Sequence, residues 1–314
     1  MNQALWVGVD CHKETLACYK NGRFKEFRTT LKGFDSAIKW AGNDSRWAIE
    51  GAYCFGRPFT TYLIKNGHEV FEVNPLLTKT WRRGFSVSGI KNDAGDAKTL
   101  VQVANTFPLQ PVSLITVKLK ELLTTRRFLI KQRTRLINHI KMLHYTRGEK
   151  LQGNVESKVG LNDLVKSEDL LIKSLALQLQ ALKHSITEIE KQIDKELPEK
   201  AMQLTKLTGV GKIQAAIIYT ELKGRLISPE ALASYAGIAP IENSSGKSNF
   251  HKNNKKGNRI LNSVFYQISL CQSRYDSLGK AYYLNKLKEG KSERHARKCL
   301  ARRLVDIIWK ILND

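Results

Sequence analysis

The sequence predicts a mixed α/β domain, then a long helical region and a compact, mostly helical C-terminal part. Up to about residue 106, short apolar segments alternate with segments of helical periodicity, which is typical of a sheet covered by helices. From about 114 to 198, leucine and isoleucine recur at heptad spacing, and beyond Pro198 the helical pattern is interrupted by glycine. These changes place three domains at residues 1–110, 111–200 and 201–314.

The first domain is expected to begin with three antiparallel strands. Asn21-Gly22 lies between the second and third apolar segments and is a strong signal for a two-residue hairpin turn. Helix and strand then alternate up to a break at Asn74-Pro75, and one more helix is expected beyond it. The strands are expected at residues 5–9, 15–19, 24–28, 47–49 and 69–73, and the helices at 33–41, 59–65 and 93–105.

The middle region is expected to form two coiled-coil helices that pair chains. Leu122, Leu129, Leu136 and Leu143 recur every seven residues in the first helix. The second helix carries apolar residues at alternating steps of three and four, the spacing of a coiled-coil seam, and a polar connection from about 147 to 161 joins the two helices. Its seam residues are Ile172, Leu175, Leu179, Leu182, Ile186, Ile189 and Ile193.

Residues 204–219 are expected to form a helix, a glycine turn and a second helix. Gly209 and Gly211 enclose the turn, and Lys212 opens the second helix. Such a helix-hairpin-helix-like turn directs backbone N–H groups and a helix N-terminus at a phosphate without reading base sequence. A plain tight turn between packed helices would leave the same pattern.

The charge of the chain points to an anionic partner. Lys and Arg number 52 against 29 Asp and Glu, a net charge of +23, which disfavours a small acidic metabolic enzyme and favours nucleic acid or an anionic membrane surface as partner. No apolar run approaches the roughly 18 residues that a bilayer crossing needs. Asp10 also interrupts the first apolar segment, where a signal peptide would stay apolar. We therefore expect a soluble, cytoplasmic protein with no membrane partner.

The cysteines predict reduced, mostly buried thiols. They are odd in number, widely scattered and without a CxxC pair, so neither a disulfide framework nor a structural zinc site is expected. They are Cys11, Cys18, Cys54, Cys271 and Cys299.

Four acidic residues are placed for metal chemistry in this basic chain. Asp10 and Glu50 each end a predicted strand, while Asp93 and Asp96 lie three residues apart on one helical face. Carboxylates presented in this way can converge on one point, where hard oxygen ligands suit Mg²⁺ or Mn²⁺. Two such ions about 4 Å apart stabilise the attacking and the leaving oxygen in phosphoryl transfer. Taken singly, the same residues could be a turn residue, a solvated strand end or a helix cap, so the prediction depends on the ordered set.

This ordered set resembles the carboxylates of the RNase H/RuvC-like fold, and the motifs around it resemble the DEDD transposases of the IS110 insertion-sequence family, to which the Piv invertase is similar. The N-terminal motifs are Gly8-Val9-Asp10-Cys11-His12-Lys13, Ile49-Glu50-Gly51, Val73-Asn74-Pro75 and Lys91-x-Asp93-x-x-Asp96-Ala97. The C-terminal motifs are Leu207-x-Gly209-Val-Gly211, Tyr235-Ala236-Gly237-Ile238-Ala239-Pro240, Ser244-Ser245-Gly246 and Lys256-Gly257-Asn258-x-x-Leu261. The resemblance covers nearly the whole chain. Two departures are Ala52, where the family has threonine, and residues 251–256, a stretch that is usually rich in Arg-Ile-Ser/Thr-Lys.

The resemblance implies an RNA-guided DNA recombinase. Family members recombine DNA with the help of a bridge RNA that pairs with donor and target sites, and the active enzyme is a tetramer built from dimers. A serine five residues after the proline of the Gly-x-x-Pro motif becomes joined to DNA while the carboxylates hold Mg²⁺. That serine is Ser245 here, with Ser244 as the alternative. The implied partners are double-stranded DNA, a non-coding RNA and further copies of the chain, at the nucleoid of a prokaryotic cell.

The basic residues are expected to hold nucleic acid through its backbone. Residues 118–150 carry ten Lys and Arg against two acids, and the last 74 residues carry sixteen against six. This spread, without one recognition helix, suits shape and backbone contacts, although a solvated helix face would carry similar charge. Trp81-Arg82-Arg83 and residues 294–298 are further candidates for phosphate or stacking contacts. The main candidate contacts are Gly209, Gly211, Lys212, Arg126, Arg127, Arg133, Lys247, Lys252, Lys255, Lys256 and Arg259.

Two other functions fit the same residues. A metal-dependent, junction-resolving nuclease would use water as its nucleophile, so Asp10→Asn would stop it and Ser245→Ala would change little. A non-catalytic scaffold for nucleic acid would cleave nothing with any metal.

Overall fold

The structure, a computed structural model, describes residues 5–85, 92–109, 111–151, 153–222, 228–245, 248–253 and 257–313. The chain divides into two units, one of residues 119–217 and the other of residues 1–118 and 218–314. Within the described residues, no helix combines the length and the apolar character that a bilayer crossing needs.

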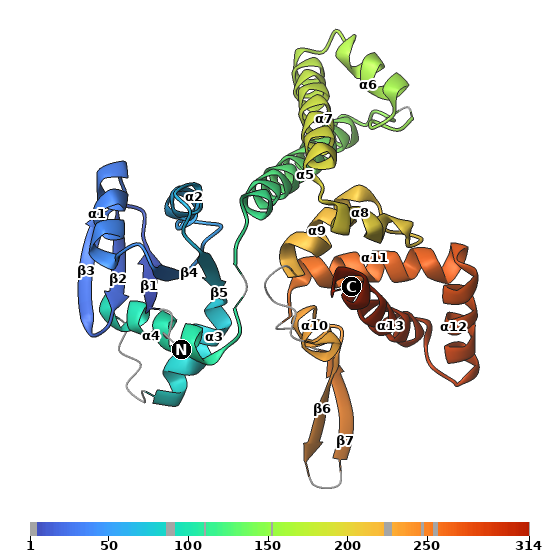
Figure 1. The fold of residues 1–314 in the computed structure, drawn as a ribbon. Helices are drawn as coiled ribbons and strands as arrows, with labels where there is room; N and C mark the ends of the chain where they lie inside the picture. The colour runs from blue at the N-terminus through green and yellow to red at the C-terminus, as the bar shows by residue number, and fades with distance from the viewer. Residues whose placement is uncertain are drawn as a thin grey trace. The chain divides into compact units, whose positions relative to one another are not determined.

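The N-terminal segment is built on a five-stranded sheet with the order β3-β2-β1-β4-β5 (Figure 1). β1 pairs antiparallel with β2 and parallel with β4, and β5 extends the parallel side. Asn21 and Gly22 both have positive φ in the turn between β2 and β3, as a type I′ hairpin requires. The five predicted strands are thus confirmed. Their bounds are β1 Leu5–Cys11, β2 Thr15–Lys20, β3 Arg23–Arg28, β4 Ser45–Glu50 and β5 Val70–Val73.

The helices of this segment include one that the sequence analysis did not predict. α1 (Leu31–Ala41), α2 (Arg57–Lys65) and α4 (Asp93–Thr106) lie where they were expected. α3 (Pro75–Phe85) begins at the expected break, because proline is tolerated at the first helical position, where its missing N–H has no helical partner. The backbone N–H groups of Leu77 and Thr78 both donate to Asn74 O.

Each face of the sheet has its own core, since successive strand residues point to opposite sides. Val7, Val9, Trp47 and Ile49 pack with residues of α1 and α2 on one face. On the other face, Ala48 and Val73 pack with Leu100, Val103 and Ala104 of α4. By the same alternation, Asp10 and Glu50 belong to the α4 face.

A glycine lets α4 approach the sheet closely. A Cβ atom added at Gly8 would lie 2.0 Å from the carbonyl oxygen of Ala97 in α4, a distance that two such atoms cannot adopt. The absence of a side chain at Gly8 therefore fixes the distance between α4 and β1.

In the second unit, α5 (Leu114–Thr146) and α7 (Leu170–Glu196) pair antiparallel within one chain. Arg126 forms an ion pair with Glu190 (2.6 Å), and Arg147 forms one with Asp169. Arg147 follows Arg126 by 21 residues, whereas its partner Asp169 precedes Glu190 by 21 residues. The two helices therefore run in opposite directions. Between these pairs lies an apolar cluster that contains Ile137, Ile140, Ala176 and Leu179.

The apolar seam predicted for the second helix therefore packs against other helices of the same chain. Four seam residues at a spacing of seven are buried, namely Ile172, Leu179, Ile186 and Ile193. The connection between the helices contains α6 (Lys158–Val165), a short helix that was not predicted. Pairing of two chains through this region stays a prediction.

The remaining chain is mostly helical. α8 (Glu199–Gln203) and a 3₁₀ turn (η1, Leu204–Lys206) precede α9 (Lys212–Leu222), and Gly209 has positive φ between them, so the predicted helix, turn and helix are present. α11 (Arg259–Tyr275), α12 (Ser277–Lys288) and α13 (Glu293–Asn313) pack together, and α10 (Pro229–Tyr235) packs on α13. A two-stranded hairpin, β6 (Pro240–Ser245) and β7 (Ser248–Asn253), joins α10 to α11 and projects from them (Figure 1). This hairpin was not predicted.

The prediction of reduced, mostly buried cysteines is confirmed only in part. All five are free, but only Cys11 and Cys18 are buried, and Cys54 is exposed. Burial raises the pKa of the Cys11 and Cys18 thiols, which keeps them protonated and unreactive.

Candidate active site and nucleic-acid contacts

Two of the predicted carboxylates lie side by side at the end of the sheet. Asp10 and Glu50 are direct partners in the parallel pairing of β1 and β4, so both side chains point to the α4 face at the same level. β4 ends here because Gly51 turns the chain with a φ of +71°, a conformation that favours glycine. The sheet register alone thus brings these two acids together.

The other two carboxylates come from the first turn of α4. The Asn92 side chain caps this helix by accepting a hydrogen bond from the Gly95 N–H (2.6 Å). Negative charge is favourable at a helix N-terminus, and both Asp93 and Asp96 lie there. Asp93 is half exposed, whereas the Asp96 side chain is only 8% exposed.

His12 completes an outer group with two of the acids. Its Nε2 atom lies 3.6 Å from Asp10 Oδ2 and 3.4 Å from Asp93 Oδ1. This nitrogen is closed off from solvent and has no hydrogen-bond partner among the described residues. The ligand atoms of the three side chains all lie within 4.8 Å of one another.

Glu50 and Asp96 form an inner group with residues of α3. Asp96 forms an ion pair with the guanidinium of Arg82. Thr78 Oγ1 donates a hydrogen bond to Glu50 Oε2 (3.0 Å). Burial raises the pKa of the Glu50 carboxyl; the Thr78 hydrogen bond and the charge of Arg82 oppose this, whereas the charges of Asp10 and Asp96 add to it. Glu50 therefore lies within electrostatic reach of Asp10, Asp96 and Arg82.

The donor set fits a divalent metal ion. Carboxylate oxygens and a neutral imidazole are ordinary ligands of first-row divalent ions. The His12 nitrogen faces two carboxylates and has no hydrogen-bond partner among the described residues, and a cation shared by the three side chains would satisfy this arrangement. Asp10, His12 and Asp93 are placed to hold such an ion, with Glu50 beside them.

Ser245 is the last residue of β6, where its Cα partner is Ser248 of β7. Ser244 precedes it in the strand, opposite Asn249. The side chains of both strands, including those of the two candidate serines, lie outside the described part of the chain.

The root of the hairpin is held tightly. A Cβ atom at Gly257 would lie 2.4 Å from the Cα of Gly237, so two backbone segments touch there. The Asn258 side chain donates to Glu221 Oε2 (2.6 Å) and to the Tyr235 hydroxyl (3.0 Å), and its N–H donates to Tyr235 O (2.7 Å). The two ends of the hairpin are thus fixed to each other.

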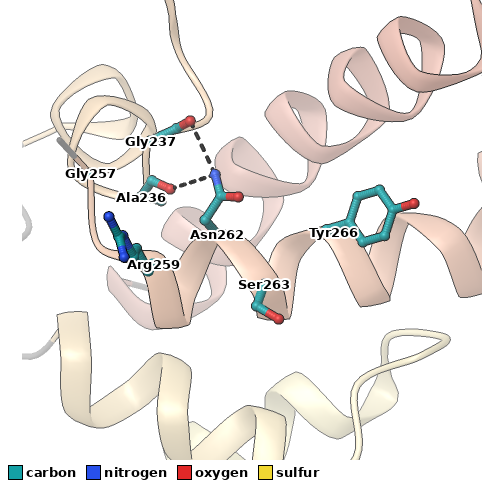
Figure 2. A pocket seen from close by; sticks show the side chains of 7 residues that line it. All are labelled: Ala236, Gly237, Gly257, Arg259, Asn262, Ser263 and Tyr266. Carbon is teal, nitrogen blue, oxygen red and sulfur yellow. Dashed lines mark hydrogen bonds between the residues drawn. The ribbon is translucent and has the colours of Figure 1, made fainter. Parts of the chain in front are cut away.

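A cavity of about 420 Å³ opens beside this root, at the N-terminal end of α11 (Figure 2). Asn262 Nδ2 donates to the carbonyls of Ala236 and Gly237, at 3.1 Å each. Arg259 and Tyr266 lie along the cavity and are both exposed. The lining residues are Ala236, Gly237, Gly257, Arg259, Asn262, Ser263 and Tyr266.

Several other predicted phosphate contacts form ion pairs within the chain. Arg126 pairs with Glu190, Arg133 with Glu156 (3.5 Å) and Lys212 with Asp194 (2.6 Å). Arg127 is half-buried. Gly209 and Gly211 lie in the turn before α9, and Lys252 lies on β7 opposite Ile241. Lys247, Lys255 and Lys256 lie outside the described residues.

The two other basic candidates also have contacts within the chain. The Trp81 indole N–H donates to Gln102 (3.2 Å), and its ring packs on Phe107, so it is turned toward the protein. Arg297 pairs with Glu293 (2.8 Å) and lies over the ring of Tyr283.

Fold and site together define an α/β protein with a cluster of acidic residues at the ends of adjacent parallel strands, followed by a helical C-terminal part. Comparison with known families agrees with this class. Residues 7–144 match the sequence model of the DEDD transposases of IS110, and residues 201–284 match that of the transposase IS116/IS110/IS902 family. The chain belongs to the IS110 family of transposases.

Individual relatives match over different lengths. An uncharacterised protein of insertion element IS116 from Streptomyces clavuligerus is 32% identical over 46% of this chain and 37% of its own length. The IS900 protein of Mycobacterium paratuberculosis is 29% identical over 46% of this chain and 38% of its own. The pilin gene-inverting protein of Moraxella lacunata is 26% identical, over 98% of this chain and 96% of its own. The match therefore spans little more than a third of the insertion-element proteins.

Sequence reasoning missed two residues of the acidic cluster. His12 stands two residues after Asp10 and directly follows the end of β1. That spacing was the available signal, because alternate residues of an extended segment point to one face. Arg82 was treated only as a phosphate contact, since the helix that carries it was not predicted.

Proposed function

We propose that this protein is a DNA transposase or recombinase that cuts and rejoins strands at the acidic cluster of its N-terminal segment. The convergence of Asp10, Glu50, Asp93 and Asp96 carries this proposal. Membership of a transposase family supports it. In this proposal the N-terminal fold is RNase H/RuvC-like, and the glycine turn at 209–211 is a helix-hairpin-helix-like contact to a DNA backbone.

The carboxylates would hold Mg²⁺ or Mn²⁺ close to the scissile phosphate. A bound divalent ion lowers the cost of the charge that develops on the attacking and leaving oxygens. The chain's own residues position it: β1 and β4 fix two acids by register, and the capped start of α4 fixes the other two.

Ser245 is the proposed nucleophile. Its Oγ would attack a DNA phosphorus, so that an Oγ–P bond forms, the P–O3′ bond breaks, and the serine proton passes to the released 3′ hydroxyl. A serine hydroxyl needs a base or a metal beside it for this attack. The acidic cluster would supply that help, within one chain or from another copy.

A bridge RNA and a tetramer built from dimers complete the proposal. The excess of positive charge over the helical regions suits backbone contacts to RNA and to two DNA duplexes. Arg259, at the cavity beside the hairpin root, is the exposed cation that we expect to contact a phosphate.

Trapping of a covalent intermediate tests the chemistry. Wild-type protein incubated with its element-end DNA, the RNA that co-purifies with it and Mn²⁺ should yield a protein–DNA adduct that survives denaturation. Ser245→Ala should abolish the adduct while RNA binding persists, and Ser244→Ala should leave it. An adduct lost only in Ser244→Ala would move the nucleophile by one residue, and an adduct kept in both variants would refute the serine chemistry.

A metal-dependent nuclease that uses water is the second candidate. It is favoured by the origin of the whole acidic cluster in residues 10–96, which needs no serine from elsewhere to cleave. In that case Asp10→Asn would stop cleavage, Ser245→Ala would cleave at the wild-type rate, and neither protein would form an adduct.

A further inference from the structure

We propose that the cavity beside the hairpin root holds one unstacked nucleotide of the DNA substrate, with its phosphate on Arg259 and its base against the ring of Tyr266. The inference deepens the proposed function and rests on it, because it places part of the DNA at a second site of the same chain. None of the carboxylates of the acidic cluster takes part in this site.

The cavity follows one face of α11. Arg259, Ser263 and Tyr266 line it and succeed one another at steps of four and three residues, so they lie in a row on the helix surface. The opposite face contains Leu261 and Phe265, which are fully buried where α11 packs on α12 and α13. Packing therefore accounts for the buried face of α11 but not for the residues on the cavity face.

The two ends of this row are available to a ligand. Among the described residues Arg259 has no ion-pair partner, whereas Arg126 and Lys212 each have one. Tyr266 is 47% exposed, and its ring has no aromatic or cationic partner in the same part of the chain. An exposed cation and an exposed aromatic ring beside one cavity are the pair of groups that single-stranded nucleic acid requires, for its phosphate and its base.

The size of the cavity suits a single nucleotide. Its volume of about 420 Å³ lies in the range of about 300–1,000 Å³ that is usual for sites of small organic ligands, whereas a base pair stacked in a duplex could not enter. Figure 2 shows Arg259 at the start of α11 and Tyr266 two turns further along, a separation of about 10 Å along the helix axis. That separation is comparable with the distance from a phosphate to the outer edge of its base.

The polar groups between the two ends do not select one base. Asn262 uses its Nδ2 atom on the carbonyls of Ala236 and Gly237 (Figure 2), which leaves Oδ1 as an acceptor. The Ser263 hydroxyl can donate or accept a hydrogen bond. Because every base can also stack on an aromatic ring, the site should hold the strand without reading its sequence.

The position of the cavity assigns the nucleotide to DNA. Ala236 and Gly237 line the cavity and come shortly before β6, which ends at the proposed nucleophile Ser245. Gly257, on the other side of the hairpin, lines it as well. A strand held here therefore passes within one hairpin length of the phosphate that the serine would attack.

Binding of single-stranded DNA to the full-length protein tests the stacking contact. A fluorescent oligo(dT) strand is titrated with protein and followed by anisotropy, in moderate salt that weakens purely electrostatic binding. Tyr266→Ala should weaken binding about tenfold or more, whereas Tyr266→Phe, which keeps the ring, should stay within about twofold of wild type. The matched control is Tyr275→Ala, which removes an exposed tyrosine of the same helix outside the cavity and should bind like wild type.

Photo-crosslinking identifies the strand that enters the cavity. Element-end DNA with 5-iodouracil at successive positions beside the cleavage site is irradiated with the full-length protein and its co-purified RNA, and mass spectrometry identifies the joined residue. A second arm carries 5-iodouracil in the RNA instead. Tyr266 should crosslink to DNA at one or two adjacent positions, and a crosslink to RNA alone would overturn the assignment to DNA.

The outcomes separate this inference from the proposed function, which is followed by the covalent adduct in the same samples. If wild type forms the adduct, equal binding by Tyr266→Ala and Tyr275→Ala, or no crosslink at Tyr266, would overturn the inference and leave the proposed function standing. A crosslink at Tyr266 without any adduct would overturn the serine chemistry alone. Absence of both the crosslink and the adduct would overturn both.

Discussion

Replacement of Gly8 by alanine tests how the acidic cluster is assembled. The new Cβ would lie 2.0 Å from Ala97 O and 3.0 Å from Val101 Cγ2, and real Cβ contacts are essentially never under 3.0 Å. Because the closer contact is with backbone, α4 must retreat from β1 by about 1 Å. Overpacking of this kind costs about 1–3 kcal/mol of folding free energy.

The displacement also reaches the site, because Asp93 and Asp96 lie on the same helix as Ala97. A misplacement of about 1 Å costs on the order of 100-fold in rate when reacting groups must be aligned. We therefore expect Gly8→Ala to unfold at lower urea concentration, to bind Mn²⁺ more weakly and to cut DNA about 100-fold more slowly.

The matched control is Gly84→Ala, because Gly84 is exposed on α3 and nothing lies within 4 Å of an added Cβ. It should be neutral or stabilising by about 0.4–1 kcal/mol. Wild-type stability and Mn²⁺ affinity in Gly8→Ala would refute the argument that this glycine sets the position of α4.

Three further outcomes are expected. Glu50→Gln should stabilise the metal-free protein at neutral pH: a carboxyl with a raised pKa binds more protons in the folded state, so stability falls as pH rises through that pKa. This gain in stability should vanish in acid. The measurement is thermal unfolding of the variant and of wild type across pH 3–8, roughly the range in which carboxyl groups titrate. A stability difference that does not change with pH would contradict the reasoning. Asn262→Ala should cost about 1–2 kcal/mol in urea unfolding through its two hydrogen bonds to the hairpin root, whereas the neighbouring, exposed Ser263→Ala should cost nearly nothing. Arg259→Gln should weaken DNA binding for all sequences alike and reduce the slope of log affinity against log salt by about one; an unchanged slope in a fluorescence titration would remove Arg259 from the phosphate contacts.

The sheet and its acids were predictable because both depend on local pattern. Strand alternation and the Asn21-Gly22 turn fix the antiparallel part, and the positions of Asp10 and Glu50 at strand ends follow from the same pattern. The role of Gly8 could not be predicted from local pattern, because it depends on contact with a helix about 90 residues further along the chain.

The contacts that were missed depend on tertiary structure. The heptads of α5 and α7 carry apolar residues at the right spacing, but spacing cannot distinguish a partner helix in the same chain from one in another. The pairs Arg126–Glu190 and Arg147–Asp169 settle the antiparallel pairing within the chain. In the same way, the polar sequence around Ser245 indicated only a turn, because a hairpin with polar residues on both faces lacks the apolar alternation of a strand.

The contact between Gly237 and Gly257 has a mechanical consequence for the proposed nucleophile. Six residues of β6 at about 3.3 Å each place the end of that strand about 20 Å from the hairpin's base. A rotation of the hairpin by about 10° about this base would therefore move Ser245 by about 3.5 Å. That displacement is more than the length of a hydrogen bond. A side chain at Gly257 would collide with the backbone of Gly237 and tilt the hairpin, so the absence of a side chain at Gly257 helps to determine the position of the serine.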